Sequence, residues 1–280
     1  TGKGYRNEIS PRQGMIRLRE FNMAELEYFI DPENPPIADL NRRTEIISLV
    51  PDPEGPHAGE VRMSFGAALD AGIIRHPTVA WFLARTWDFL VEVGIKPGKM
   101  RFRQHASTEM AHYAEDCWDC EIHGEHGWIE CVGIANRTCH DLESHESHSK
   151  SKSLRAWRQF AEPRSQTIDR LAPNGAVIGP TFRADAGAVV AALESLTNLP
   201  DSLPFELTLE NGSSVTIEEG MVERRMETVN VSGEWYTPHV IEPAFGIDRI
   251  IWHVLDHAYE EAEKEGEAYT FLRLAEGISS

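Results

Sequence analysis

Arginine and glutamate residues near the N-terminus have a spacing that suits a phosphate-bearing ligand. Arg6 and Glu8 lie two residues apart, and Arg17 and Arg19 repeat this spacing after a turn-forming segment at 10–14. In a β-strand, residues two apart project from the same face. A guanidinium group can donate two parallel hydrogen bonds to phosphate oxygens, and a carboxylate accepts hydrogen bonds from an amino group. The pattern therefore predicts either a site for a ligand with phosphate and amino groups or a cross-strand ladder of ion pairs.

More candidate groups occur downstream, in apolar segments. Glu130 lies in a strand-like run, and Glu242 and Arg249 flank a glycine-containing bend. A buried carboxylate is costly unless a cation, a metal or a ligand amine accompanies it, so each of these acids needs a partner. The sequence contains neither the phosphate-binding G-x-x-x-x-G-K-[ST] loop nor G-x-G-x-x-G, H-E-x-x-H or G-x-S-x-G. The common nucleotide-binding and hydrolase signatures are therefore not available to explain these residues.

The four cysteines of the chain fall close together, at Cys117, Cys120, Cys131 and Cys139. With His123, His126 and His140 nearby, their spacing resembles that of metal ligands. The alternative is that Cys117 and Cys120 lie in a helix and Cys131 in an apolar strand, where a free cysteine acts as a small hydrophobic residue. We favour the second interpretation, so zinc is not expected, and a reducing cytosol is the default compartment.

Hydrophobic periodicity and turn residues predict an α+β protein in which helices flank an antiparallel sheet. Strands are expected at 14–21, 101–105, 127–137 and 240–246, together with a hairpin that turns at Asn211-Gly212. Helices are expected at 77–93, from Ser107 to about Cys120, at 185–197 and at 248–266. The segment 140–153, rich in histidine and serine, is expected to be a solvated loop.

The charge of the chain limits its possible partners. With 27 Lys and Arg against 45 Asp and Glu, the net charge of −18 argues against nonspecific nucleic-acid binding. Basic residues nevertheless gather at 1–20 and 149–164, which suits a nucleic acid bound in a single orientation. No long apolar run is apparent and the N-terminal residues lack the apolar core of a signal peptide, so we expect a cytoplasmic protein without membrane contact.

Four segments, in order, resemble class II aminoacyl-tRNA synthetases, specifically the glycyl-tRNA synthetases of archaeal and eukaryotic type. YRNEISPRQGMIRLREFNMAELEYFIDP (5–32) is similar to motif 2 of that family and PHVIEPAFGIDRI (238–250) to motif 3. RFRQHASTEMAHYAEDCWDCEI (101–122) and GWIECVGIANRTCHDL (127–142) extend the resemblance. It implies the class II antiparallel sheet flanked by helices, with a catalytic core at 1–145 and 236–280. Residues 146–235 would be an inserted α+β subdomain that contacts tRNA.

The resemblance also implies roles for individual residues. The ATP site would comprise Arg6, Asn7, Glu8, Arg17, Leu18, Phe21, Glu130, Cys131 and Arg249. Arg6 and Arg249 would be catalytic, and Glu130 would be a ligand of Mg²⁺. Glycine would be bound by Glu25, Glu242, Pro243 and Ala244, and the acceptor end of tRNA would approach Pro11, Arg12 and Gln13.

The implied activity is glycine–tRNA ligation. ATP activates glycine to glycyl-adenylate, which transfers the glycyl group to tRNA(Gly), and the full-length protein would be a homodimer. The family usually has serine at the position of Ala244 and aspartate at that of Asn136. Motif 1 and the anticodon-binding domain have no counterpart here, so we expect a catalytic-core fragment that can be inactive by itself. The alternative is a non-catalytic synthetase-like paralogue acting as a binding or accessory subunit.

Overall fold

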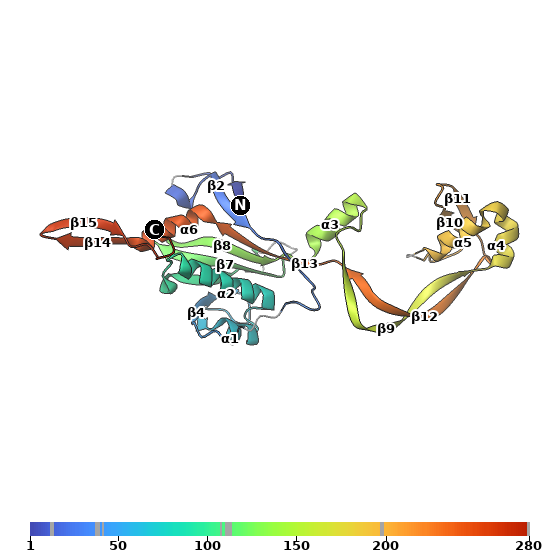
Figure 1. Ribbon diagram of the computed structural model, residues 1–280, viewed down its shortest axis with the longest axis horizontal. Coiled ribbons are helices and arrows are strands. Elements are labelled where there is room, and N and C mark those ends of the chain that lie inside the picture. Colours follow the sequence, from blue (N-terminus) through green and yellow to red (C-terminus); the bar gives the residue numbers. More distant parts are fainter. Residues whose placement is uncertain are drawn as a thin grey trace. The chain divides into compact units, whose positions relative to one another are not determined.

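The computed structural model describes residues 1–11, 14–36, 40, 42–106, 108–109, 114–196 and 199–278. The chain divides into two compact units, Thr1–Ala156 with Tyr236–Ser280, and Trp157–Trp235 (Figure 1). The boundary expected after residue 145 falls inside a helix of the first unit, α3 (His140–Ser149). Helices and mainly antiparallel strands occur together, so the chain is an α+β protein, as the periodicity predicted.

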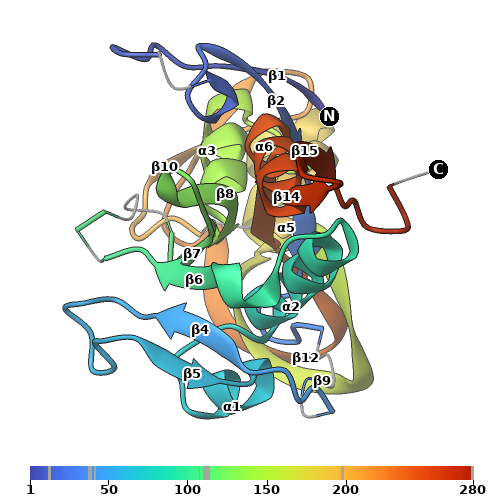
Figure 2. The same cartoon turned by 90° about the vertical axis from the view of Figure 1, so that its left-hand side faces the viewer.

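A nine-stranded sheet forms the centre of the first unit (Figures 1 and 2). Its strand order is β1–β2–β13–β8–β7–β6–β4–β5, with β3 also paired to β13, and β4 and β6 run parallel to each other. The strands are β1 (Gly2–Tyr5), β2 (Glu20–Glu25), β3 (Tyr28–Ile30), β4 (Ile47–Val50), β5 (Val61–Met63), β6 (Met100–Gln104), β7 (Asp116–Gly124), β8 (Gly127–Asn136) and β13 (His239–Gly246). The central strands therefore come from distant parts of the chain.

The two faces of this sheet differ in polarity because successive residues of a strand alternate between them. One face carries Phe102, Cys120 and Val132, which pair across β6, β7 and β8 and are fully buried. The opposite face, which we call the open face, carries a row of paired residues at the adjoining positions. This row consists of Arg103, Asp119, Gly133, Ala244 and Glu25.

Two helices, α2 (Pro77–Glu92) and α6 (Ile247–Ala258), contact the central strands and contribute to the apolar core. In α2, Pro77 occupies the first turn and the ring of His76 accepts a hydrogen bond from the N–H of Thr78 at 3.2 Å. The helix predicted at 77–93 is therefore confirmed. The smaller α1 (Phe65–Asp70) packs against α2, and the 3-10 turns η1 (Gly14–Ile16) and η2 (Pro97–Lys99) lie in connections.

The second unit has its own apolar core. The long strands β9 (Ala156–Pro173) and β12 (Val222–Tyr236) pair with each other, and β10 (Phe205–Thr208) pairs with β11 (Ser214–Ile217). The predicted turn at Asn211-Gly212 is confirmed, with Gly212 at φ +83°. The helices are α4 (Gly175–Phe182) and α5 (Ala186–Glu194), joined by the 3-10 turn η3 (Arg183–Asp185).

One stretch of the second unit, Gly175–Glu194, is long and apolar enough to cross a membrane, judged by length and composition only. The sequence analysis did not identify it. In the structure the stretch comprises α4, η3 and α5, with Pro180 inside α4 and a positive φ of 47° at Arg183. Its apolar residues Ile178 and Val189 are fully buried in the core of this unit.

The strand predicted at 14–21 is wrong. Gly14 has a φ of +57° and begins η1, and β2 starts only at Glu20. Arg6, Glu8, Arg17 and Arg19 therefore lie in the connection between β1 and β2, not on shared strand faces. The side chain of Arg19 donates a hydrogen bond from Nε to the backbone oxygen of Glu8 at 3.1 Å, so the predicted ion-pair ladder is replaced by a contact to the backbone.

The helix predicted from Ser107 to Cys120 is also wrong where it is described, because Asp116–Gly124 forms β7. Residues 107 and 110–113 lie outside the described residues. Trp118, Cys120 and Ile122 are fully buried at alternate positions, which is a strand pattern. Asp119 and Glu121 between them are buried as well. The strand therefore has no solvent-exposed face, although its sequence alternates between apolar and acidic residues.

The predicted loop at 140–153 contains α3, which has no buried residue. Acidic residues in its first turn and His148 in its last turn favour a helix through the helix dipole, although no apolar face marks it. The helix predicted at 248–266 ends at Ala258 and is followed by β14 (Tyr259–Lys264) and β15 (Glu267–Leu272). Glu265 and Gly266 both have positive φ, as a two-residue hairpin turn requires.

Candidate active site

A pocket lies on the open face where the β1–β2 connection, β8, β13 and the start of α6 meet. Residues that the sequence analysis selected from separate segments converge on it. They are Arg6, Glu8, Arg17, Leu18, Phe21, Glu130, Cys131, Ala244 and Arg249. Asn7 is exposed and does not belong to this lining. The pocket combines three guanidinium groups with an aromatic ring and carboxylates, which suits a ligand with phosphates and a planar base.

Arg249 connects the segments that form the pocket. It lies in the first turn of α6, where its Nε donates to the backbone oxygen of Ile16 at 3.0 Å and its Nη1 donates to that of Glu130 at 2.6 Å. These bonds join η1, β8 and the N-terminus of α6. The guanidinium charge and the helix N-terminus both favour a bound anion at this position.

Glu130 lies among charges of both signs. Desolvation raises the pKa of its carboxyl group above the usual value of 4.5, and the nearby carboxylate of Asp119 raises it further. Arg249, Arg6 and His105 act in the opposite direction. The side chain of Glu130 is nevertheless exposed, not buried as the apolar segment suggested, so a cation that arrives with a ligand can reach its carboxylate.

The sequence analysis missed a pair of polar residues in the same lining, Asn22 and Asp248. One carboxylate oxygen of Asp248 accepts the backbone N–H of Asn22 at 2.6 Å, and the other accepts its side-chain amide at 2.8 Å. Asp248 is only 7 % exposed and fixes β2 to the start of α6. The sequence signal was an aspartate in the first helical turn next to Arg249, but nothing in the sequence indicated its partner.

The acids predicted to bind glycine lie on neighbouring strands beside this pocket, but not in its lining. Glu25 pairs in register with Ala244, and Glu242 lies two residues before Ala244 on the same face of β13. Arg137 contacts Glu242 at 3.2 Å. Burial raises the pKa of Glu242, Arg137 lowers it and Glu25 raises it, so the two acids lie close enough to interact.

The remaining predicted residues have different positions. Pro243 pairs with the fully buried Ile134, so its ring lies on the apolar face of the sheet. Its backbone oxygen accepts a hydrogen bond from the N–H of Leu26 at 3.0 Å. Pro11 is partly exposed in the β1–β2 connection. Arg12 and Gln13 lie outside the described residues.

The four cysteines do not converge. Cys120 is buried on the apolar face, Cys131 lies 3.6 Å from the ring of His253 in α6, and Cys139 precedes α3. Cys117 therefore does not form a metal centre with the other three cysteines. Within the described residues, a different donor set comes together, in which atoms of His105, Cys117 and Asp119 lie within 4.8 Å of one another.

The fold and the pocket together define an α+β protein with a candidate nucleotide site on the open face of its sheet. No protein-family model matches the chain. Curated proteins nevertheless match it over nearly its whole length. It is 43 % identical to the glycine–tRNA ligase of Methanothrix thermoacetophila over 99 % of this chain and 48 % of that protein.

Similar matches come from other lineages. The glycine–tRNA ligase of Methanocaldococcus jannaschii is 42 % identical over 94 % of the chain, and that of Drosophila melanogaster is 36 % identical over 92 %. The chain spans about half the length of the archaeal relatives (48 %) and 35 % of the Drosophila protein. The chain is thus a relative of archaeal and eukaryotic glycine–tRNA ligases, and the resemblance predicted from its motifs is confirmed.

Proposed function

We propose that this chain forms the catalytic core of a class II glycine–tRNA ligase. The observation that carries the proposal is the convergence of Arg6, Glu8, Phe21, Glu130 and Arg249 on one pocket beside two interacting carboxylates. Relatives that share up to 43 % of its residues are named glycine–tRNA ligases, which supports the same substrates here. The antiparallel sheet and flanking helices are consistent with the class II catalytic fold.

ATP occupies the pocket in this proposal. Phe21 stacks on the adenine ring, and the carboxylate of Glu8 accepts a hydrogen bond from the adenine amino group. Arg6 binds the α-phosphate, while Arg17 and Arg249 bind the other phosphates. Arg249 is suited to this role because its hydrogen bonds to two backbone oxygens fix the guanidinium group before ATP arrives.

Glycine binds next to the α-phosphate. Its ammonium group donates hydrogen bonds to the carboxylates of Glu25 and Glu242. Gly133 and Ala135 of β8 lie opposite Ala244 and Glu242 of β13 in the sheet register. These residues have no side chain or only a methyl group, so the floor of the site offers no large recognition surface. The acids fix the ammonium group, and selection depends on excluding larger amino acids.

The reaction then needs positioning and charge stabilisation rather than a protein nucleophile. The glycine carboxylate attacks the α-phosphorus, pyrophosphate leaves, and a hydroxyl of the terminal tRNA nucleotide later attacks the glycyl carbonyl and releases AMP. Arg6 and Arg249 stabilise the charge that develops on the phosphate oxygens. Mg²⁺ bound with ATP would supply additional positive charge, and the exposed carboxylate of Glu130, which lies in the pocket lining, would be available as its ligand.

The remaining partners follow from the same proposal. The acceptor end of tRNA(Gly) approaches the connection around Pro11, Arg12 and Gln13, and the second unit, Trp157–Trp235, contacts tRNA elsewhere. The whole protein acts as a homodimer in the cytoplasm. Arginines of β9 and β12 such as Arg158, Arg164 and Arg225 supply cationic groups for phosphate contacts, although acidic residues accompany them.

ATP–pyrophosphate exchange tests the proposal directly. Exchange by the protein should require glycine and should not occur with alanine or serine alone. Arg249→Gln should lower kcat/KM by about 10²–10³-fold, because a charge-stabilising donor is lost. Arg85→Gln is the matched control, since Arg85 is 60 % exposed and pairs with Asp88 on α2, away from the pocket lining.

Exchange that is independent of glycine, or an Arg249→Gln variant as active as Arg85→Gln, contradicts the proposal. A folded protein that binds neither ATP nor a glycyl-adenylate analogue in calorimetry would instead be the non-catalytic paralogue. Ala244 is the observation that favours this second candidate, because it removes a hydroxyl group that the family usually places beside glycine.

A further inference from the structure

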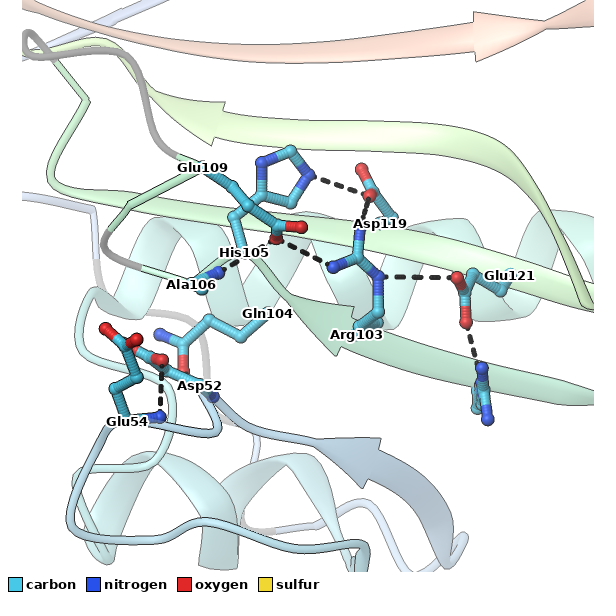
Figure 3. A network of polar contacts seen from close by, with 10 residues as sticks. Asp52, Glu54, Arg103, Gln104, His105, Ala106, Glu109, Asp119 and Glu121 are labelled. Carbon is cyan, nitrogen blue, oxygen red and sulfur yellow. Dashed lines mark hydrogen bonds and ion pairs between the residues drawn. The ribbon is translucent and has the colours of Figure 1, made fainter.

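A cysteine and an aspartate of β7 meet a histidine that directly follows β6. The ring Nε2 of His105 lies 2.7 Å from Oδ2 of Asp119 (Figure 3). The sulfur of Cys117 lies within 4.8 Å of donor atoms of both residues. The backbone N–H of His105 donates to the oxygen of Cys117 at 2.9 Å, which fixes the register of the two strands at this point. The order thiol, imidazole and carboxylate is that of an activated nucleophile.

The surroundings of this cluster keep the imidazole ring charged. Hydrogen bonds to Asp119 and then to Cys117 raise the pKa of His105 to about 10. Arg103 adds a second cation, with Nη2 at 3.0 Å from the same Asp119 oxygen (Figure 3). Arg103 also contacts Glu109 at 2.9 Å and Glu121 at 3.4 Å, so its charge is shared among several carboxylates. The sulfur of Cys117 therefore faces an imidazolium that the buried Asp119 holds in place.

The other three cysteines lack an imidazolium partner among their described contacts; Cys131 does lie 3.6 Å from the ring of His253, but burial lowers the pKa of that ring and favours its neutral form. Cys120 is fully buried, and burial raises its thiol pKa. Cys131 is 3 % exposed, and burial raises the pKa of its thiol to about 12. Cys139 is partly exposed like Cys117, but burial and the neighbouring Glu143 raise its pKa. The chain thus contains three internal comparisons for Cys117.

We propose that Cys117 is a nucleophilic cysteine, activated by His105, that forms mixed disulfides with small disulfides. The Cys117 sulfur attacks one sulfur of the disulfide, the S–S bond breaks, and the other half leaves as a thiolate that takes up a proton. The proton of the Cys117 thiol resides on His105. This reaction lies outside the proposed glycine activation, which uses no protein nucleophile, and it needs no oxidant other than the disulfide itself.

A divalent metal is the other ligand that a His–Cys–Asp set could take. The contacts favour the thiol reaction, because Arg103 and the charged His105 ring already share the Asp119 oxygen. A metal ion would have to displace both the ring proton and one of these contacts. Stoichiometric zinc in the purified protein is therefore an outcome that would overturn the proposal.

The experiment measures the rate at which oxidised glutathione modifies each cysteine, followed by mass spectrometry of the peptides. An ordinary thiol with a pKa of about 8.5 is only a few per cent ionised near pH 7. The thiolate and not the thiol is the nucleophile, and a neighbouring imidazolium stabilises a thiolate, so we expect Cys117 to gain about tenfold in rate. Because burial and Glu143 raise the pKa of Cys139, Cys117 should react at least about ten times faster than Cys139.

His105→Gln should slow Cys117 by about tenfold, to the rate of an ordinary thiol, because it removes the imidazolium. His126→Gln is the matched control, since His126 is exposed and stacks on Trp252 rather than on a cysteine. Continued protection of the buried Cys120 and Cys131 shows that each variant is folded. Asp119→Asn tests the positioning residue: the pH dependence of the Cys117 rate should shift toward that of an ordinary thiol.

Several results would overturn the proposal. Cys117 reacting no faster than Cys139 in the folded protein is one, and a His105→Gln rate equal to that of His126→Gln is another. Zinc that blocks the reaction until a chelator removes it would assign the cluster to metal binding instead. Because glycine-dependent exchange is measured separately, failure of this inference leaves the proposed function unaffected, and the converse also holds.

Discussion

Replacing Asp248 by asparagine tests how firmly β2 is held to the start of α6. In the native protein, both oxygens of the Asp248 carboxylate accept hydrogen bonds from Asn22, at 2.6 and 2.8 Å. In Asp248→Asn the side-chain shape is kept, but one acceptor becomes an NH₂ group that faces a donor. The substitution therefore breaks one charge-assisted bond at a site that is 7 % exposed, and it removes a negative charge from the first helical turn.

The magnitude follows from these two losses. A hydrogen bond to a buried charged group contributes about 1.5–3 kcal/mol. A favourable charge at a helix N-terminus contributes about 0.3–1 kcal/mol. Asp248→Asn should therefore destabilise the attachment of β2 by about 2–4 kcal/mol, which corresponds to an increase in local exchange rates of about thirty- to a thousandfold.

Hydrogen exchange measured by mass spectrometry can detect this change in the peptides that contain β2 and the start of α6. Asp169→Asn is the control, since Asp169 pairs with Arg224 at 2.6 Å but both side chains are substantially exposed, at 35 % and 50 %. Exposed pairs contribute about 0–1 kcal/mol, so exchange near Asp169 should rise less than about fivefold. If exchange of β2 in the folded Asp248→Asn variant also rises less than fivefold, the carboxylate does not hold the strand.

Three further predictions concern the core, pH and the glycine site. Phe102→Ala should lower the stability of the first unit by about 3–5 kcal/mol, because Phe102 is fully buried against Phe65; a shift in Tm of only a degree or two would contradict this. Burial lowers the pKa of His253 and His257 below the usual 6.5, so the folded state favours the neutral rings; stability is complete above pH 6.5 and is lost as the pH falls through the lowered values. Urea unfolding at several pH values should reveal this loss of stability, and replacing both histidines by glutamine should reduce it. If the double variant loses the same stability in acid as the native protein, these histidines do not cause the loss. Ala244→Ser should lower the glycine KM by about two- to tenfold in the exchange assay if the added hydroxyl gains a hydrogen bond, and an unchanged KM would show that it does not.

Local sequence signals predicted several elements correctly because the physics behind them is local. Pro77 and Gly94 limited α2 to within a residue or two, and the Asn211-Gly212 dipeptide located a hairpin whose glycine has φ +83°. Most residues selected for the nucleotide site also lie together in one pocket; they were selected because their chemical types and order resemble those of a known family. These successes did not require any knowledge of which strands pair.

The errors arose where distant contacts decide the structure. Asp119 and Glu121 are buried because Arg101 and Arg103 on the neighbouring strand neutralise them, and this concealed β7 in the sequence. The bond between Asn22 and Asp248 spans 226 positions, so neither residue predicts its partner. Residues 14–21 alternate like a strand in the sequence, but Gly14 has a positive φ and Gly14–Ile16 forms a 3-10 turn.

The place of β13 in the sheet has a consequence for the order in which the protein is made. β13 lies between β2 and β8, but it emerges from the ribosome after both and after the entire second unit. β2 and β8 therefore lack the strand that lies between them until β13 is synthesised. During this time β9 and β12, which pair with each other, can already assemble. A nascent chain that ends before His239 has neither the strand that carries Glu242 and Ala244 nor the helix that carries Arg249. The candidate active site can thus form only after the entire second unit, β13 and the start of α6 have been synthesised.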